Sequence, residues 1–476
     1  VTIPISLLEN NASMNVLLIS TYDLGHQPFA LASPAAWLKE VGANVTCLDV
    51  SIERLNEDIV KAAQLVAFHI PMHTATRLAM EMAAKVKAIK PEARLCFYGL
   101  YAPLNEAILR EIGADIILGG EYETGLVAAY KRLLEGNFGD QQEPLISTDK
   151  QNFRVPDRTD LPKLTQYAHL SMGNGEKRTA GYTEASRGCK HFCRHCPIVP
   201  VYKGRFRTIS SDVVMADIRS QVEAGAQHIT LGDPDFFNGP GHALPLIEKF
   251  HAEFPNITYD ATIKIEHLLK YSEHMETLVR TGCLFATTAV ESVNDEILKL
   301  LDKGHTREEF KRVTQMAKEA GLVLSPTFVP FLPWATVEGY IDLLSFLAEL
   351  DLIGYVAPVQ LTIRLLVPQG SHMMKIDDME TFITGHDVGA LSYQWRHPDP
   401  RMDQLHKDVT SLVEDHQTRE ASRSETFKGL WNRANAAAGQ PATTLNLGTA
   451  DINLVPQMSE PWYCCAEPTS AQLAGL

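Results

Sequence analysis

Residues 181–196, GYTEASRGCKHFCRHC, decide what kind of fold and centre the chain builds. A strand is expected near 181–185, and the chain then enters a loop that carries Cys189, Cys193 and Cys196. A loop leaving a strand can direct three thiols at one point without distorting regular structure. Five of the eight cysteines lie in two tight clusters, so we expect ligand or redox chemistry rather than a disulfide scaffold.

Two kinds of centre fit these three thiols. In a cubane 4Fe–4S cluster they satisfy three irons, and the fourth iron keeps an open position. The amino and carboxylate groups of S-adenosylmethionine suit that position, and an electron from the cluster can then cleave its carbon–sulfur bond to give a 5′-deoxyadenosyl radical. The alternative is a tetrahedral zinc site completed by His191 or His195.

Strand–helix alternation continues after the cysteines. Six strand–helix units predict a partial parallel (β/α)6 TIM barrel over 179–370, with its chemistry at the carboxyl ends of the strands. The last segment, 371–476, is more polar and is expected to form a helical extension. The strands that follow the first are expected at 228–231, 257–263, 284–290, 322–329 and 355–363.

Residues 14–136 form an earlier α/β unit. Short apolar runs alternate with helical patterns five times, which predicts a doubly wound, Rossmann-like parallel sheet. Such sheets bind ligands beyond the carboxyl ends of their strands. The stretch 137–178, rich in Pro, Asp and Gly, is expected to be a linker. The predicted cleft is formed by the loops 21–26, 71–74, 99–102 and 119–123.

Composition excludes several classes of partner. The chain has 43 Lys and Arg against 58 Asp and Glu, a net charge of -15 spread along its length, so we expect no binding to nucleic acid. No apolar run approaches the roughly 18 residues of a membrane helix, and residues 1–14 lack the pattern of a signal peptide. These observations predict a cytoplasmic protein without a membrane partner.

The motif CxxxCxxC after a strand, preceded by Ser186, Arg187 and Gly188, resembles the signature of the radical S-adenosylmethionine (radical SAM) superfamily. The resemblance implies a 4Fe–4S cluster, S-adenosylmethionine as cofactor or co-substrate, and an electron donor such as flavodoxin or ferredoxin. It also implies a small-molecule substrate and sensitivity to oxygen.

Further residues match the superfamily position by position. His195 stands where the family usually has an aromatic residue near the adenine. Gly232 and Asp233 resemble the segment whose backbone receives the methionyl amino group, with a helix cap as the alternative role of Asp233.

Three charged residues at later strand ends also match. Lys264 resembles a partner of the methionyl carboxylate, and Glu291 resembles the acidic residue that helps to hold the cofactor. Arg364 ends the expected sixth strand, where it can meet substrate or cofactor. The alternatives are a solvated surface cation for Lys264, a structural ion pair for Glu291 and an ordinary salt bridge for Arg364.

A doubly wound domain before the barrel resembles the cobalamin-binding subclass of the superfamily. His73 and Thr74 after the third strand, and Gly120 and Glu121 after the fifth, look like positions of that subclass. The DxHxxG motif that supplies a histidine ligand to cobalamin elsewhere is absent, because residues 23–26 have the wrong spacing. A cleft without a cofactor is the alternative.

The second cysteine cluster is Cys464 and Cys465, within the sequence WYCCAEP at 462–468. It resembles the tail of a radical SAM group that ends in CCAEP or CUAEP, where U is selenocysteine. Exchange of sulfur and selenium implies a reactive role: a redox pair, a covalent substrate anchor or a ligand for a soft element such as arsenic. An idle thiol pair or a disulfide is the alternative.

Three functions follow from these observations. The first is a radical SAM enzyme acting on a small molecule, with methyl transfer through cobalamin as its commonest subclass version. The second is cobalamin-independent transfer of a carbon fragment to a soft atom held by the tail cysteines. The third, of another class, is a zinc or iron–sulfur protein that binds without turnover.

Overall fold

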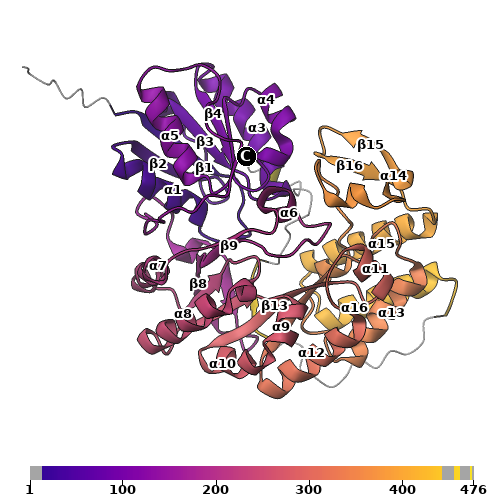
Figure 1. Cartoon of the computed structure of the whole chain (residues 1–476). Coiled ribbons are helices and arrows are strands. Elements are labelled where there is room, and N and C mark those ends of the chain that lie inside the picture. The colour runs from indigo at the N-terminus through magenta and orange to yellow at the C-terminus, as the bar shows by residue number, and fades with distance from the viewer. Residues whose placement is uncertain (1–12, 442–454, 461–471, 474–476) are drawn as a thin grey trace, which may run out of the picture.

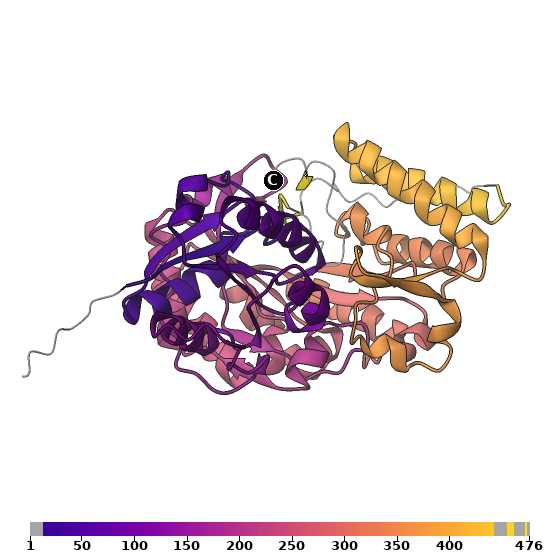
Figure 2. The ribbon, with the colours of Figure 1, turned by 90° about the horizontal axis from the view of Figure 1, so that it is seen from above.

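A computed structural model describes residues 13–441, 455–460 and 472–473. Two α/β units lie one above the other, and a pair of long helices packs beside the lower unit (Figures 1 and 2). The chain segment with the cysteine loop runs between the two units, near α6 and β9 in Figure 1. This arrangement sets the loop against both sheets.

The N-terminal unit is the expected doubly wound sheet. Its strand order is β2-β1-β3-β4-β5-β6, with parallel pairing throughout, and buried apolar residues fill both faces. The last strand comes from the stretch expected to be a linker. The strands are β1 (Asn15–Ser20), β2 (Asn44–Asp49), β3 (Leu65–His69), β4 (Arg94–Tyr98), β5 (Ile116–Gly120) and β6 (Ile146–Ser147). The helices are α1 (Phe29–Glu40), α2 (Glu57–Ala62), α3 (His73–Ile89), η1 (Pro103–Asn105), α4 (Glu106–Glu111) and α5 (Glu123–Leu134).

The second unit is a curled, partial barrel. Five parallel strands stand in the order β14-β13-β12-β11-β8, and the antiparallel strands β7 and β17 extend the β8 edge. The strands are β7 (His169–Ser171), β8 (Lys177–Thr183), β11 (His228–Leu231), β12 (Thr258–Thr262), β13 (Cys283–Glu291), β14 (Val323–Phe328) and β17 (Gln457–Met458). The covering helices are α7 (Ser211–Glu223), α8 (Pro240–Glu253), α9 (Ile265–Lys270), η4 (Ser272–His274), α10 (Met275–Arg280), α11 (Asp295–Leu300), α12 (Arg307–Ala320) and α13 (Val337–Glu349).

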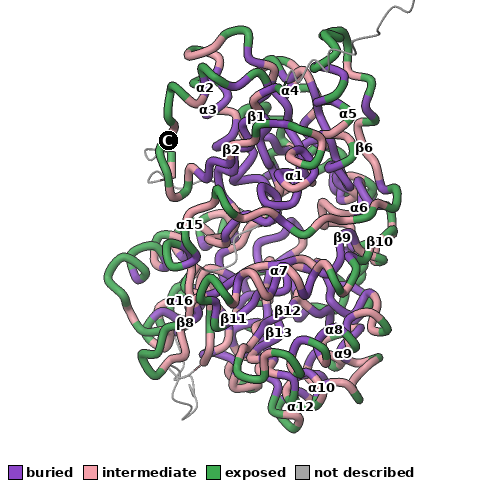
Figure 3. Tube along the Cα trace, turned by 90° about the vertical axis from the view of Figure 1, so that its left-hand side faces the viewer, coloured by how far each residue is buried: buried purple, intermediate pink, exposed green. Residues whose placement is uncertain are grey.

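Buried residues follow the strands of both sheets, as the purple stretches of the tube in Figure 3 show. Side chains alternate between the two faces of a strand, so residues that are paired across neighbouring strands share a face. One such row faces the outer helices and consists of Gly181, Ile229, Tyr259 and Cys283. Ile229 and Tyr259 accordingly belong to the main apolar core. The opposite, concave face is the barrel lumen.

The sixth barrel strand is absent where it was expected. Residues 355–363 contain the 3-10 helix η5 (Pro358–Leu361), and the sixth position is reduced to a single parallel bridge between Phe331 and Arg364. Pro358 explains the difference, since it fixes φ and has no N–H to donate to a strand ladder.

The C-terminal extension is helical, as expected, and its two long helices form an antiparallel pair. A short hairpin, β15 with β16, was not expected and stands apart from both main sheets (Figure 1). Of the residues that the structure describes, no helix is long and apolar enough to cross a membrane. The remaining elements are η2 (Leu164–Gln166), β9 (Ser186–Gly188), α6 (Ile198–Tyr202), β10 (Phe206–Thr208), η3 (Phe236–Asn238), η6 (His372–Lys375), α14 (Met379–Phe382), β15 (Ile383–Asp387), β16 (Ser392–Trp395), α15 (Pro400–Thr418) and α16 (Arg423–Ala437).

Candidate active site

The three cysteines lie in the loop between β9 and α6, and all are free thiols. Gly188 starts this loop with φ +74, and a side chain there would collide with the Arg205 carbonyl and the Tyr202 ring. Only glycine combines that backbone conformation with so close an approach. The turn therefore directs the chain straight from a strand into the cysteine loop.

The ligand spacing bears on the choice between cluster and zinc. In a tetrahedral zinc site, Zn–S bonds of ~2.3 Å hold all sulfurs within roughly 4 Å of one another. In the described residues, the ligand atoms of Cys189, His191 and Asp235 all lie within 4.8 Å of one another. The three sulfurs of Cys189, Cys193 and Cys196 do not meet this limit. The donor set and its wider spacing fit a multi-iron cluster.

The two histidines of the loop point to different carboxylates. His191 lies 3.4 Å from both Asp235 and Glu266, whereas His195 Nε2 lies 3.2 Å from Glu291 Oε1. Neither arrangement gathers a histidine with all three thiols. Burial raises the pKa of the Cys189 and Cys196 thiols, so positive charge from a bound centre is needed to stabilise their thiolates.

Glu291 is held beside the loop by two basic groups. Its carboxylate accepts a hydrogen bond from Lys303 Nζ at 3.2 Å and contacts His195 at the same distance. Burial alone would raise the pKa of Glu291, yet Lys303 and His195 outweigh it and lower the pKa to about 2. The backbone of Glu291 has φ +68 at a bulge between β13 and β14. Strain of this kind persists where the surroundings over-determine it, and is frequent at functional sites.

Gly232 and Asp233 directly follow β11, next to the segment that precedes the cysteines. Asp233 accepts hydrogen bonds from the Ser186 hydroxyl and from the Ala185 N–H, the latter at 3.0 Å. Burial raises the pKa of Asp233 to about 7. Asp233 therefore braces the approach to the loop, and Gly232 leaves room for the Tyr182 hydroxyl, which a side chain at 232 would strike.

Lys264 is only 7% exposed, which rules out the alternative of a solvated surface cation. It precedes α9, and its Nζ lies 3.2 Å from Glu266 Oε2. His305 stands near both Lys264 and Lys303; burial and these two lysines lower its pKa to about 3. The mouth of the barrel thus holds two buried ammonium groups, which suit a carboxylate ligand.

Arg364 is occupied by the C-terminal extension. Its guanidinium pairs with Asp403 at 2.8 Å and lies 3.6 Å from the centre of the Trp395 ring. These contacts support an ordinary salt bridge, the alternative role of Arg364.

The sequence-predicted residues of the N-terminal unit lie at the carboxyl edge of its sheet. His73 and Thr74 begin α3 and are buried. Gly120 ends β5 with φ +73, where a side chain would collide with the Ser147 carbonyl. Glu121 is buried and accepts a hydrogen bond from the Tyr202 hydroxyl at 3.3 Å.

Arg187 was named in the sequence only as part of the superfamily signature, and its structural role was missed. Its buried guanidinium pairs with Glu123 at 2.8 Å, Glu184 at 2.6 Å and Glu121 at 3.5 Å, and lies over the ring of Tyr122. It therefore joins the cysteine loop directly to the β5 edge of the N-terminal sheet. Its position two residues before Cys189 was the available signal.

The edge of the N-terminal sheet has features of a ligand cleft. Ser20 Oγ and His69 Nδ1, at the ends of β1 and β3, are buried and have no hydrogen-bond partner within the described ranges. A separate cavity of about 360 Å³ lies between α5 and the segment 142–149, and Glu121, Tyr122 and Arg132 are among its lining residues. Buried orphan polar groups are rare, so they favour a site for a polar ligand. Cys464 and Cys465 lie outside the described residues.

Comparison with known proteins identifies the second unit. The model of the radical SAM superfamily matches residues 183–347. A tRNA-2-methylthio-N(6)-dimethylallyladenosine synthase of Desulfitobacterium hafniense is 25% identical over 181 residues, 36% of this chain and 40% of that protein. A putative methylthiotransferase of Methanocaldococcus jannaschii is 21% identical over 316 residues, 63% of this chain and 66% of that protein. The chain spans only 34% to 40% of the length of three such synthases.

Solved structures resemble the whole two-unit fold. The cobalamin-dependent S-adenosylmethionine radical enzyme OxsB, with aqua-cobalamin and S-adenosylmethionine bound, has a TM-score of 0.68 at 14% identity, over 88% of this chain and 72% of that one. The radical S-adenosylmethionine methyltransferase TsrM from Kitasatospora setae, with cobalamin and a 4Fe–4S cluster bound, has a TM-score of 0.55 at 16% identity, over 71% of each chain. The family match and the CxxxCxxC loop together show that residues 183–347 form a radical SAM domain, a type of domain that uses a 4Fe–4S cluster and S-adenosylmethionine.

Proposed function

We propose that the chain is a radical SAM enzyme that acts on a small molecule, with methyl transfer as the reaction and cobalamin as a second cofactor in the cleft of the N-terminal unit. The cluster and S-adenosylmethionine supply the radical chemistry, for which side chains have no equivalent. The chain's own residues bind, orient and shield these groups.

One observation carries the proposal: the cysteine loop and the N-terminal cleft share Arg187. This guanidinium contacts Glu121 and Glu123 at the cleft edge and stands two residues before Cys189. Tyr202, at the end of α6 after the loop, packs against Leu104 from the same edge. A ligand in the cleft would therefore face the cluster across a rigid, buried contact.

In this proposal Cys189, Cys193 and Cys196 bind three irons. Lys264 neutralises the methionyl carboxylate, and the backbone at Gly232 receives the methionyl amino group. A further pair, Glu291 with His195, holds the nucleoside side of S-adenosylmethionine. Asp233 acts by position, since it fixes the segment before the loop.

The cleft residues His73, Thr74, Gly120 and Glu121 would contact cobalamin. The orphan atoms of Ser20 and His69 fit a ligand rich in amide groups, and the 360 Å³ cavity suits a side arm of a large cofactor. The OxsB and TsrM structures compared above were determined with cobalamin bound, which supports the proposal by fold.

The deciding experiment is anaerobic purification from cells supplied with iron, sulfide and cobalamin, followed by metal analysis and absorption spectroscopy. About four irons per chain with a broad band near 400 nm, and a cobalt chromophore in the same sample, are expected. Iron without cobalt would remove the cobalamin part of the proposal. Zinc that stays bound, with no iron taken up, after reconstitution with iron and sulfide would overturn the radical reaction altogether.

The substrate and the electron donor are tested in the same preparation. A reduced flavodoxin or ferredoxin is expected to support cleavage of S-adenosylmethionine, measured as 5′-deoxyadenosine or as the demethylated product. The tRNA and ribosomal protein in the names of relatives belong to those proteins. A small molecule without nucleic acid remains our prediction, and turnover that requires added RNA would contradict it.

A second candidate, radical carbon transfer to a soft atom on the tail cysteines, is favoured by the segment just before them. In β17, Gln457 and Met458 pair with β7, and the Glu460 carboxylate accepts a hydrogen bond from the Tyr22 hydroxyl at 2.7 Å. Cys464 is four positions after Glu460 in the sequence, and a chain reaches at most about 14 Å over that length. The described segment before the tail cysteines is thus anchored on the loop after β1.

The tail reaction is tested by Cys465→Ser, with Ala466→Ser as a control that keeps both thiols. Loss of product with intact cleavage of S-adenosylmethionine is expected for the first variant only. Unchanged product yield in Cys465→Ser would remove the tail from the chemistry.

A further inference from the structure

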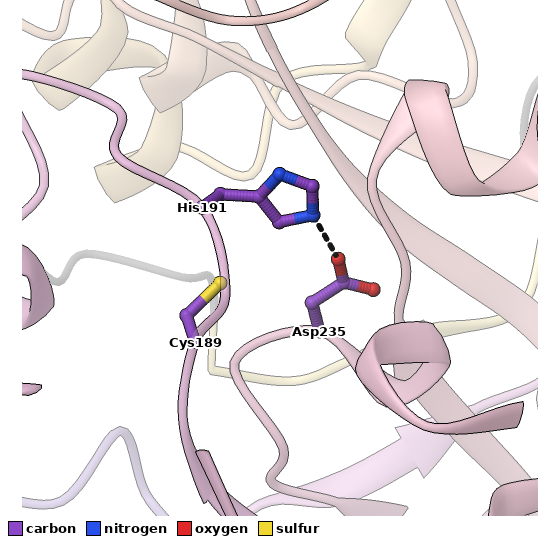
Figure 4. A group of neighbouring side chains, drawn as sticks. All are labelled: Cys189, His191 and Asp235. Carbon is purple, nitrogen blue, oxygen red and sulfur yellow. Dashed lines mark ion pairs between the residues drawn. The ribbon is translucent and has the colours of Figure 1, made fainter. Parts of the chain in front are cut away.

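Three potential metal ligands, and a fourth in contact with one of them, lie beside the cysteine loop at three strand ends. His191 follows β9, Asp235 follows β11 and caps η3, and His267 lies in α9 after β12. Ligand atoms of Cys189, His191 and Asp235 all lie within 4.8 Å of one another, as Figure 4 shows. His267 Nδ1 lies 2.7 Å from Asp235 Oδ2. One point in space is therefore surrounded by sulfur, nitrogen and oxygen donors.

The facing atoms of this group have no other partner. His191 Nε2, Asp235 Oδ2 and His267 Nδ1 are fully buried, and within the described residues none makes a hydrogen bond of acceptable geometry. Their separations satisfy an ion pair, but their directions do not satisfy a hydrogen bond. These three buried atoms contact only one another, and without hydrogen-bond geometry, so a ligand placed between them would use lone pairs that are otherwise unsatisfied.

A second set of contacts orients the first histidine. His191 Nδ1 lies 3.4 Å from Glu266 Oε2, and Glu266 is itself paired with Lys264 at 3.2 Å. A histidine that binds a metal commonly donates its other ring N–H to a carboxylate, which fixes the tautomer. Glu266 therefore leaves the Nε2 lone pair of His191 free toward Asp235.

We propose that the cluster-free chain binds one divalent ion of the zinc class through Cys189, His191, Asp235 and His267. One sulfur, two imidazole nitrogens and one carboxylate oxygen are a complete tetrahedral set for Zn²⁺. Binding replaces the Cys189 thiol proton, which passes to water, and no electron is transferred. With a thiolate, a carboxylate and two neutral imidazoles, the occupied site has no net charge.

Cys189 makes this site and the cluster mutually exclusive. In the proposed function Cys189 binds an iron, and it cannot at the same time complete the zinc site. Zinc therefore holds the loop in a cluster-free state, and cluster assembly has to displace it. The site itself does not depend on the proposed function, because Cys193 and Cys196 take no part in it.

The test uses the full chain, prepared anaerobically without cluster, and Co²⁺ as a spectroscopic probe. We expect one equivalent of Co²⁺, with the visible bands of a tetrahedral ion and a sulfur-to-cobalt charge-transfer band. The double variant Cys193→Ser, Cys196→Ser, which cannot hold a cluster, is expected to bind Co²⁺ as tightly as the unchanged chain. Its failure to bind would overturn the site in favour of one built from the three cysteines.

Single variants test the ligands. His267→Gln and Asp235→Asn are each expected to weaken binding more than about 100-fold, beyond the usual effect of losing an outer contact. Cys189→Ser is expected to remove the charge-transfer band. The matched control His386→Gln removes an exposed imidazole of β15 and should change nothing. Unchanged affinity in both His267→Gln and Asp235→Asn, with native circular dichroism, would overturn the proposal.

A kinetic readout separates this site from the cluster chemistry. One equivalent of Zn²⁺ is expected to slow the rise of the 400 nm band during cluster assembly in the unchanged chain. It should have no such effect in His267→Gln. Equal inhibition in both proteins would also overturn the proposal.

Discussion

Glu121 and Glu291 occupy equivalent places in the two units, yet their carboxyl groups behave in opposite ways. Each stands at the carboxyl end of a parallel strand, β5 or β13, and each is buried. Burial raises the pKa of Glu121 to about 7. Arg187 opposes this effect only in part, because its charge is shared among three carboxylates. Glu291 instead faces Lys303 and His195, which lower its pKa to about 2.

The difference shows that the place of a carboxylate in the fold does not decide its charge. Neighbours from other elements decide it, since a buried charge is stable only with a compensating partner. The cleft edge thus holds a carboxyl group that titrates near neutral pH, while the cluster edge holds a permanent anion between basic groups. Four changes test this comparison.

Cys193→Ala should have the largest effect, because it removes the centre beside Glu291. Both iron content and cleavage of S-adenosylmethionine are expected to fall to background, measured by metal analysis and by 5′-deoxyadenosine formation. Cys47→Ala, a buried thiol of β2 outside the loop, is the control and should keep its iron. A variant that retains a full cluster would contradict the assignment of the loop.

Arg187→Met should be the most destabilising change at the interface, because it leaves Glu123 and its neighbours buried without a cation. We expect a loss of about 3–5 kcal/mol in the free energy of unfolding, measured by urea denaturation. The control Arg154→Met removes a largely exposed ion pair with Glu40 and should cost no more than about 1 kcal/mol. Equal effects of the two substitutions would show that the contacts of Arg187 carry no special weight.

Glu291→Gln should act mainly on the cofactor. The amide can still accept from Lys303, so we expect a loss of about 1–3 kcal/mol in stability and at least tenfold weaker binding of S-adenosylmethionine. Equilibrium dialysis against the cluster-loaded enzyme measures the binding, with the exposed Glu296→Gln as control. Unchanged affinity would restrict Glu291 to a structural ion pair.

Glu121→Gln should have the smallest effect, and one that depends on pH. The pKa of Glu121 is raised on folding, so its contribution to stability is complete at pH values below about 4.5, the value for the unfolded chain. It is lost as the pH rises through about 7. Relative to the unchanged chain, the variant is expected to gain about 1 kcal/mol in unfolding free energy between pH 6 and pH 8. A difference independent of pH would mean that Glu121 keeps its charge throughout.

Local patterns were sufficient to predict much of the fold. The alternation of apolar strands and amphipathic helices predicted both α/β units, because side-chain periodicity is a property of consecutive residues. It failed at residues 355–363, where an apolar pattern resembles a strand but Pro358 prevents ladder pairing.

The candidate site was predictable only in part. The cysteine loop was recognisable because its ligands are close in sequence, and Glu291 because it ends a strand. Arg364 has the same sequence signal as Glu291, yet it is engaged by Asp403 and Trp395 of the C-terminal extension. No local pattern distinguishes the two.

The sequence by itself determined the superfamily, the two α/β units and the three thiols of the cysteine loop, since each rests on residues close together in the chain. Only the tertiary structure decided the hub at Arg187, the opposite charge states of Glu121 and Glu291, and the convergence of His191, Asp235 and His267. The physical reason is that parallel strands bring together loops that are tens of residues apart, and the charge of a buried group depends on those distant neighbours.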